Sequence, residues 1–455
     1  MRRPSPRLFA ILVLLLAAMV GAVTAYQSYQ AAQRPGGAPG PRVHPVITLL
    51  AKIVGGDIDE PAGLPVLNQR FHWVGAADLG AITRYGDHWY LALGDTDYAL
   101  PQLLFTNGNF LIATAPYNAG SLTGLTFDNY LALHSVRGSL PVPGRAILPD
   151  PGYTIPGSLF TVSWRGRQYL FAQYMEGGDF GGHDHWSRDS RIARYDDTLR
   201  IFRPYKPRTY TWQRRDRVAT NANRLQYGFG QSAFWEDPSA GYLYMVGAPT
   251  NRFGGVKLAR IAIASFLDPR DQRPWSYYLG DGRWSASAAD EMSIDAQVSW
   301  LIPPRDPAFS LDKNYNTARY PPGTSQCSYL TIAEFSLVWD PYLRSFLLLT
   351  SSAGCPPNVL RVYTAPAIAG PWTQQAQDIP MRLAHTDPSW DYYAPYTTPS
   401  LLRDGGRTMY FLASVYSHYG IYLFKATFSA NQPHHGGTDG QGAHGRAGRT
   451  PAPVR

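Results

Sequence analysis

A two-strand unit that recurs five times is the feature that most constrains the fold of this 455-residue chain. Each copy has a small or polar start, an apolar strand, a turn at Gly, Asp or Pro, and an aromatic-rich return strand. The copies occupy residues 77–96, 156–175, 230–249, 333–352 and 397–416. The turn residues are those that short hairpin loops require. Helical periodicity is hard to find after residue 60, so the sequence predicts an all-β fold.

A third apolar segment follows most copies, for example at residues 109–115 and 420–428. Five roughly four-stranded meanders predict a five-bladed β-propeller. A sandwich or barrel of many short strands is the alternative, but the matched order of strand types in all five units favours the propeller. The last unit lacks a fourth strand of its own. We expect an N-terminal segment around residues 45–54 to complete it, because ring closure removes open sheet edges.

The N-terminus predicts export. Arg2, Arg3 and Arg7 precede an apolar run from Leu8 to Ala25, which suits a cleaved signal peptide or an uncleaved membrane anchor. In either case the body lies outside the cytoplasm, facing the cell wall if anchored. The predicted organisation is a signal peptide or anchor at 1–26, a flexible linker at 27–44, a propeller domain at 45–429 and a disordered tail at 430–455.

The charge distribution excludes one class of partner. The chain has a net charge of +8, but residues 1–42 carry five Arg and no acid, and residues 430–455 carry three Arg and one Asp. The body is therefore nearly neutral, whereas a nucleic-acid-binding domain needs a basic stripe on its folded surface. We expect contact with a membrane only through the N-terminal segment, no cofactor, and a monomer.

The chain has two cysteines, Cys327 and Cys355. In an exported protein such a pair predicts one disulfide. Two unpaired buried thiols are the alternative.

The first strand of each propeller blade lines the central channel, so the first residues of these strands should converge on one mouth. Two of them are carboxylates, which are costly in a crowded channel unless they are used or paired. The converging residues are Asp78, Ser158, Gln231, Glu334, and either Thr398 or Ser400.

Asp78 also has a predicted partner. The first hairpin turns at Gly86-Asp87, so Tyr85 pairs with His88, and counting back places Asp78 opposite Asp95. Such cross-strand neighbours have Cβ atoms about 4.5–5.5 Å apart. Two carboxylates this close favour one ionised and one protonated group, as acid/base catalysis requires. The alternative is structural: Asp95 as an Asx turn that ends the strand and Asp78 as a cap on backbone amides.

Several other side chains are candidates for binding substrate at the same mouth. The Gly-rich insertion 176–190 offers His185 and Trp186, or is simply a solvated loop. His183 and His185 have a spacing that metals can use, but no third ligand is evident, so we predict no metal site. No nucleophile elbow, phosphate-binding loop or dinucleotide fingerprint is present, which leaves carboxylate chemistry. The remaining candidates for substrate contact are Asn251, Arg252, Tyr393, Tyr396 and Tyr416.

The stretch "GAADLGAITRYGDHWYLALGDT" resembles glycoside hydrolase family 183, formerly domain of unknown function 4185, whose members carry a similar D-L-G strand followed by G-D-T. Further similar stretches are "HWSRDSRIARYDD", "YLYMVGAPTNRFGGVKLARI", "AEFSLVWDPYLRSFLLL" and "AGPW", so the resemblance covers roughly residues 70–430 in order. It implies a five-bladed propeller that cleaves D-arabinan internally, with Asp78 and Asp95 as its catalytic carboxylates.

Two functions are therefore expected from the sequence. The first is an exported endo-D-arabinanase in which one of Asp78 and Asp95 protonates the leaving oxygen and the other activates water or attacks the anomeric carbon. Glu334 is the reserve catalytic or substrate-orienting carboxylate. The second is a non-catalytic glycan-binding propeller of the cell wall. A metal-dependent hydrolase that uses His183 and His185 is a third hypothesis.

Overall fold

The structure of the protein is a computed structural model, and it describes residues 43, 45–54, 64–68, 74–98, 111–117, 125–131, 154–176, 189–205, 229–248, 255–271, 275–285, 301–302, 332–351, 359–374, 379–380, 392–415 and 420–429. The predicted signal or anchor segment (1–26) and the predicted tail (430–455) lie outside these residues. Within the described ranges, no helix has the length and apolar character that crossing a bilayer requires.

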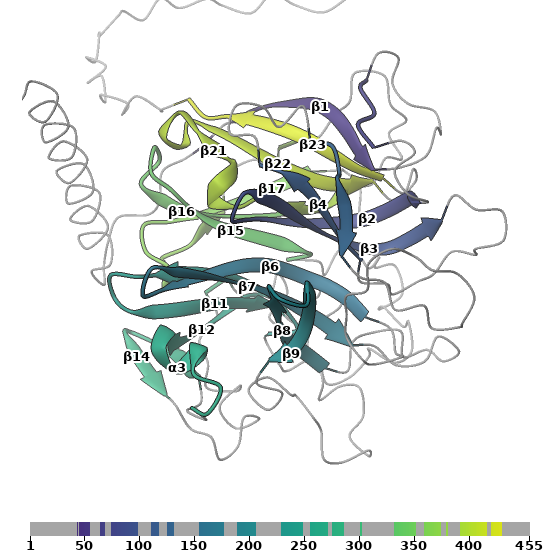
Figure 1. Ribbon diagram of the computed structural model, residues 1–455. Helices are drawn as coiled ribbons and strands as arrows, with labels where there is room; N and C mark the ends of the chain where they lie inside the picture. Colours follow the sequence, from purple (N-terminus) through teal and green to yellow (C-terminus); the bar gives the residue numbers. More distant parts are fainter. Residues whose placement is uncertain are drawn as a thin grey trace, which may run out of the picture.

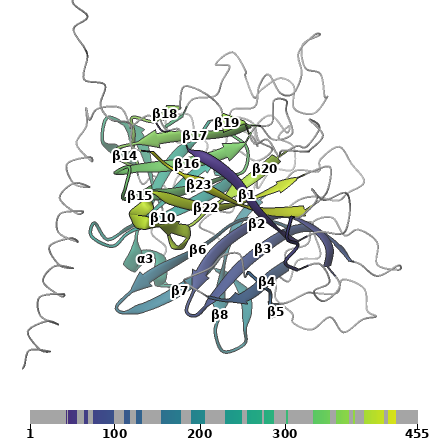
Figure 2. The same ribbon diagram turned by 90° about the horizontal axis from the view of Figure 1, so that it is seen from above.

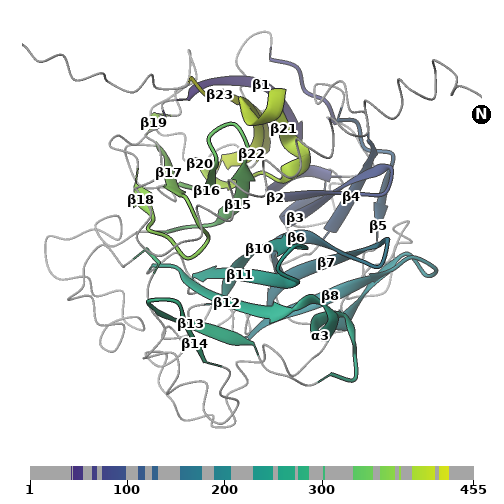
Figure 3. The ribbon, with the colours of Figure 1, turned by 90° about the vertical axis from the view of Figure 1, so that its left-hand side faces the viewer.

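Five separate antiparallel sheets stand in a ring, with their first strands toward the centre (Figure 1, Figure 3). This is the five-bladed β-propeller that the repeat predicts. The first two blades are β2 (Val74–Tyr85), β3 (His88–Tyr98), β4 (Leu111–Pro116) and β5 (Asn129–Leu131), then β6 (Thr154–Trp164), β7 (Arg167–Glu176), β8 (Asp189–Asp196) and β9 (Ile201–Tyr205). The third blade is β10 (Gln231–Asp237), β11 (Tyr242–Ala248), β12 (Lys257–Ala262), β13 (Ser276–Gly280) and β14 (Arg283–Ser285), with the short helix α3 (Ile263–Leu267) after β12. The fourth blade is β15 (Phe335–Asp340), β16 (Ser345–Ser351), β17 (Val359–Ala365), β18 (Thr373–Gln374) and β19 (Ile379–Pro380).

The fifth blade joins the two ends of the described chain. It contains β20 (Tyr392–Tyr396), β21 (Leu402–Arg403), β22 (Thr408–Val415), β23 (Gly420–Thr427) and, as its outermost strand, β1 (Val46–Val54). β1 runs antiparallel to β23, from the pair Val46 and Thr427 to the pair Val54 and Ile421 (Figure 2). The prediction that an N-terminal segment closes the ring is confirmed.

The start of the fifth blade differs from the sequence prediction. The first strand is β20, which precedes Thr398 and Ser400, the two residues expected to begin it. Pro399 lacks an amide hydrogen and opens a 3-10 turn, η4 (Pro399–Leu401), which interrupts the strand between β20 and β21. Tyr393 therefore takes the place in the ring that was expected for Thr398 or Ser400.

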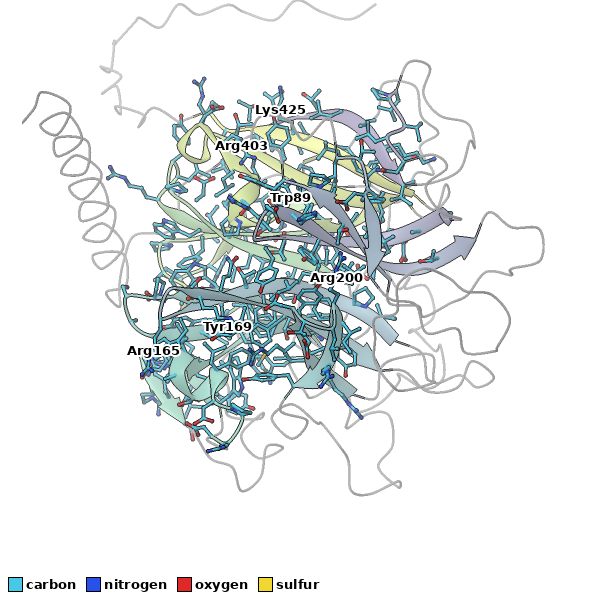
Figure 4. The ribbon with its side chains drawn as sticks, viewed as in Figure 1. Trp89, Arg165, Tyr169, Arg200, Arg403 and Lys425 are labelled. Carbon is cyan, nitrogen blue, oxygen red and sulfur yellow. The ribbon has the colours of Figure 1, made fainter. Side chains whose placement is uncertain are left out.

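Both faces of each blade are covered, which explains the nearly continuous apolar strands. Five hydrophobic clusters fill the five gaps between neighbouring sheets. On β3, Leu91 and Leu93 pack toward the fifth blade, whereas Tyr90 and Ala92 pack toward the second. Figure 4 shows Trp89 inside the molecule and Arg165, from the β6–β7 turn, at its periphery. Successive strand residues point to opposite faces of a sheet, so a strand covered on both faces needs apolar residues at odd and even positions alike.

Candidate functional site

A central cavity of about 290 Å³ lies inside the ring. Its walls are the first strands of all five blades and the residues that directly follow β10 and β20, so it is the central channel that the repeat predicts. The lining runs through residues 81–83, 158–161, 233–236, 335–337 and 396–399. The rings of Phe160 and Phe234 stack across neighbouring blades with centroids 3.9 Å apart.

Each first strand, or the residue just before it, places one polar side chain at or just upstream of this lining. All five are buried, with at most 8% of the residue's surface exposed. We call them the mouth residues: Asp78, Ser158, Gln231, Glu334 and Tyr393. The sequence identified four of them, and the shifted start of the fifth blade supplies Tyr393.

Asp78 is held from two sides. The hydroxyl of Tyr393 donates a hydrogen bond of 2.8 Å to its Oδ2. Its Oδ1 lies against the Cα of Gly94, where a Cβ would overlap both Oδ1 and the side chain of Leu79. The glycine of the G-D-T motif is therefore required by the close approach of Asp78, a role that glycine alone can fill without displacing the carboxylate.

The backbone around Asp78 is unusual. Leu79 has φ +66° and Gly80 has φ +85°, so two left-handed residues follow Asp78 directly. A left-handed conformation costs a non-glycine residue roughly 1–2 kcal/mol and persists only where the surroundings impose it. Ser414 of β22 supplies one such constraint, because its Oγ donates a 3.2 Å hydrogen bond to the carbonyl oxygen of Leu79.

Asp95 lies across from Asp78 through a pair of bulges. The turn is as predicted, with Tyr85 opposite His88. Between the pairs Ala77–Thr96 and Leu79–Leu93, however, the single residue Asp78 faces both Gly94 and Asp95, and a second bulge at Gly80 restores the register. The hairpin count predicts that Asp95 alone lies opposite Asp78. In the structure, Gly94 and Asp95 share that position. The side chain of Asp95 lies outside what the structure describes.

Ser158 and Gln231 occupy the mouth on the second and third blades. Within the described part of the chain, Ser158 Oγ and Gln231 Oε1 are buried without a hydrogen-bond partner. Gln173, which lies opposite Ser158 on β7, holds the residue before Gln231, because its Nε2 donates a 3.0 Å hydrogen bond to the carbonyl oxygen of Gly230. Unsatisfied buried polar atoms are rare in native proteins and call for an explanation.

Glu334 enters the mouth just before β15. Its carbonyl oxygen accepts a 3.2 Å hydrogen bond from Thr350 Oγ1, which in turn accepts from the amide of Ala333. The inner strand β20 separates it from Asp78 around the ring, because β15 packs against β20 and β20 against β2. Its place suits a supporting carboxylate better than a direct partner of Asp78.

A third carboxylate lines the cavity away from the mouth. Both oxygens of Glu236 accept 2.9 Å hydrogen bonds from the amide of Ser163. Burial raises the pKa of Glu236, and the hydrogen bonds from Ser163 act in the opposite direction. Glu236 is thus tied to the turn end of the channel and is separate from Asp78.

The other predicted site residues divide into two groups. Tyr393 and Tyr396 are both 3% exposed and pack in the cluster between the first and second blades, so the structure uses Tyr393 as a hydrogen-bond donor inside the protein. The described residues hold no cluster of three His, Cys, Asp or Glu side chains placed for a metal ion. The predicted residues that lie outside the described ranges are His183, His185, Trp186, Asn251, Arg252, Cys327, Cys355 and Tyr416.

Gly94, Ser414 and Gln173 belong to the site, but the sequence patterns do not indicate their roles. Ser414 and Gln173 sit on second strands, where only the register shows that they reach a first strand. The G-D-T motif did contain Gly94, but its close approach to Asp78 depends on the bulges.

The family described as "Domain of unknown function (DUF4185)" matches residues 67–301, just over half of the chain. No curated protein matches this chain. Among solved structures, a putative hydrolase from Bacteroides ovatus is 14% identical, with 78% of this chain and 86% of that chain covered and a TM-score of 0.46. A family 117 glycoside hydrolase from Zobellia galactanivorans is 12% identical, with 86% and 92% covered and a TM-score of 0.41. An alpha-L-arabinanase mutant from Cellvibrio cellulosa is 13% identical, with 76% and 90% covered and a TM-score of 0.40.

Proposed function

The chain belongs to the DUF4185 family, and from the chemistry of its mouth residues we propose that it is an exported glycoside hydrolase. The observation that carries the proposal is the buried Asp78 at the mouth of the channel, fixed by Tyr393 and by the close approach of Gly94. A buried carboxylate is costly. Strain and burial at one carboxylate are typical of catalytic groups.

The substrate class proposed is D-arabinan, the α-D-arabinofuranose polymer of mycobacterial arabinogalactan and lipoarabinomannan. It comes from the resemblance of the D-L-G and G-D-T motifs around Asp78 and Asp95. The buried polar atoms of Ser158 and Gln231 support a polyhydroxylated ligand, because sugar hydroxyls both donate and accept hydrogen bonds. In this proposal the propeller faces the cell wall, whether released or held by the N-terminal segment.

Hydrolysis would use two carboxylates. One protonates the leaving glycosidic oxygen, and the other either activates a water molecule or attacks the anomeric carbon. Asp78 and Asp95 are the proposed pair, with Glu334 as the carboxylate that orients substrate or supports them. A carboxyl separation of about 5–5.5 Å suits retention and one of about 6.5–9.5 Å suits inversion. The anomeric configuration of the first product, read by proton NMR, decides between these outcomes.

The alternative proposal is a non-catalytic binding propeller for cell-wall glycan. Incubation of the purified protein with mycobacterial arabinogalactan, followed by chromatography of the soluble products, separates the two. Release of oligoarabinosides over time supports the hydrolase. Retention of the protein on the polymer without release supports the binding protein.

A further inference from the structure

The two oxygens of Asp78 have different surroundings. Oδ2 accepts the hydrogen bond from Tyr393, whereas Oδ1 is turned toward Gly94, next to Asp95 on the same strand. A phenol hydroxyl donates more strongly to a carboxylate than to a neutral carboxylic acid, because the bond to the ion is charge-assisted. The contact with Tyr393 therefore favours the ionised form of Asp78.

The hydrogen bond is built into the closure of the ring. Tyr393 is on the first strand of the fifth blade and Asp78 is on the first strand of the first blade. Each is followed by a left-handed residue, Leu79 with φ +66° and Ala394 with φ +54°, at a bulge in its strand. The two residues thus occupy matching places in the repeat.

A second tether joins the same two blades. Ser414 lies opposite Tyr393 in the register of β20 and β22, and its hydroxyl holds the carbonyl oxygen of Leu79. The fifth blade consequently fixes both the side chain and the backbone at Asp78. A carboxylate held from two strands of the fifth blade keeps a constant orientation, as a group that must act on water or on an anomeric carbon requires.

We propose that Tyr393 is a positioning residue that holds Asp78 ionised, so that Asp78 is the base or nucleophile of the reaction and Asp95 the acid. This inference rests on the proposed function. In the base form, Asp78 takes a proton from water as the water oxygen bonds to the anomeric carbon. The bond from that carbon to the leaving oxygen breaks at the same time, and the leaving oxygen takes the proton of Asp95.

The test compares Tyr393→Phe with Tyr392→Phe. Tyr392 is the neighbouring, equally buried tyrosine of β20, and within the described residues its hydroxyl has no hydrogen-bond partner. On polymeric arabinan, Tyr393→Phe should lower kcat by roughly 10- to 100-fold, the loss of one hydrogen bond to a charged group, with little change in KM. Tyr392→Phe should leave kcat unchanged. Thermal unfolding of both variants checks that they fold.

Leaving-group dependence assigns the roles. Aryl oligoarabinofuranosides with a dinitrophenyl leaving group need little acid assistance, so Asp95→Asn should keep most of its rate on them and lose it on the polymer. Asp78→Asn and Tyr393→Phe should be slow on both substrates. Recovery of Tyr393→Phe or Asp78→Asn on the activated substrate would make Asp78 the acid and overturn the inference, as would an unchanged kcat in Tyr393→Phe.

A second readout needs no turnover. Carbon-13 NMR of aspartate-labelled protein reports the ionisation of Asp78, identified by its absence in Asp78→Asn. At pH 6 we expect a carboxylate in the wild type and in Tyr392→Phe, and a shift toward the carboxylic acid in Tyr393→Phe. A protonated Asp78 in the wild type contradicts the inference, even if the protein hydrolyses no arabinan and the proposed function fails.

Discussion

The hydroxyl of Tyr393 donates a 2.8 Å hydrogen bond to Oδ2 of Asp78, across 315 residues of sequence. The bond joins the first strand of the last blade to the first strand of the first blade. The same two blades meet again where Ser414 holds the carbonyl oxygen of Leu79. The geometry of the proposed catalytic carboxylate therefore depends on closure of the ring, and stability and activity should be coupled through the fifth blade.

Closure by β1 should be essential to stability. Ile53, fully buried on β1, packs between the fifth and first blades, whereas Val46, on the same strand, is 69% exposed. Ile53→Ala should lower the free energy of unfolding by about 2–5 kcal/mol, because it leaves a cavity in that cluster. Val46→Ala is the matched control and should change it by less than about 0.5 kcal/mol. Urea denaturation measures both, and equal effects would contradict the packing described for β1.

Gly94 should be needed for activity more than for folding. In Gly94→Ala the new Cβ must displace Asp78 Oδ1 or Leu79, so kcat should fall while the fold persists at a cost of about 1–3 kcal/mol. Gly241→Ala is the control: it has φ +72° but open space around it, so it should cost about 1–2 kcal/mol without loss of kcat. Full activity in Gly94→Ala would show that Asp78 does not need its observed position.

Ser158 should bind substrate at the expense of stability. Its Oγ is a buried, unpartnered atom within the described chain, so Ser158→Ala should leave stability unchanged or increase it by up to about 1 kcal/mol. If Ser158 meets a sugar hydroxyl, the same variant should raise KM by roughly 2- to 10-fold, the worth of one hydrogen bond.

Ser336→Ala is the matched control for Ser158→Ala. Ser336 lines the same cavity, but its Oγ already donates a 2.9 Å hydrogen bond to the carbonyl oxygen of Pro395. This variant should lose stability and keep its KM. A KM unchanged in Ser158→Ala would remove Ser158 from the binding site.

Asp340 should make the protein less stable as the pH rises. Burial raises the pKa of this carboxyl from its ordinary value of 3.8 to about 6, although the amides of Tyr342 and Leu343 donate hydrogen bonds to it. The folded protein thus holds the proton more tightly than the unfolded chain. The resulting stability is fully present below about pH 3.8 and is lost as the pH rises through about 6.

Asp340→Asn mimics the protonated form and keeps an oxygen for the turn. At pH 7 it should be more stable than the wild type by on the order of 2 kcal/mol, and at pH 3.5 the two should be equal. Thermal unfolding across this range measures the difference. A difference that does not change with pH would refute the assignment to Asp340.

The sequence predicts the ring and its closure because these depend on periodic patterns. The apolar strands alternate with Gly, Asp and Pro turns, and the turn at Gly86-Asp87 sets the register of the first hairpin. The repeat also predicts four of the five mouth residues. These features are local or repeated, so they can be read without knowledge of contacts.

The finer geometry of the site could not be predicted. The left-handed conformation of Leu79 is imposed by packing and by Ser414, and no residue pattern signals it. The run "YYAPY" of β20 has no alternation of polar and apolar residues, and the turn at Pro399 interrupts the strand. The repeat therefore predicts the start of the fifth blade's first strand too late in the chain, at Thr398 or Ser400. The sequence therefore presents Tyr393 as a candidate for substrate contact, although the structure buries it against Asp78.

The most direct measurement of the central claim is the effect of Asp78→Asn on binding and on turnover in the same preparation. Asp87→Asn, at the exposed turn of the same hairpin, is the control. Asp78→Asn should lower the release of oligoarabinosides from arabinogalactan by at least about 10³-fold, with polymer binding within about threefold of the wild type. Release within tenfold of the wild type, or no release by the wild type itself, would contradict Asp78 as a catalytic carboxylate.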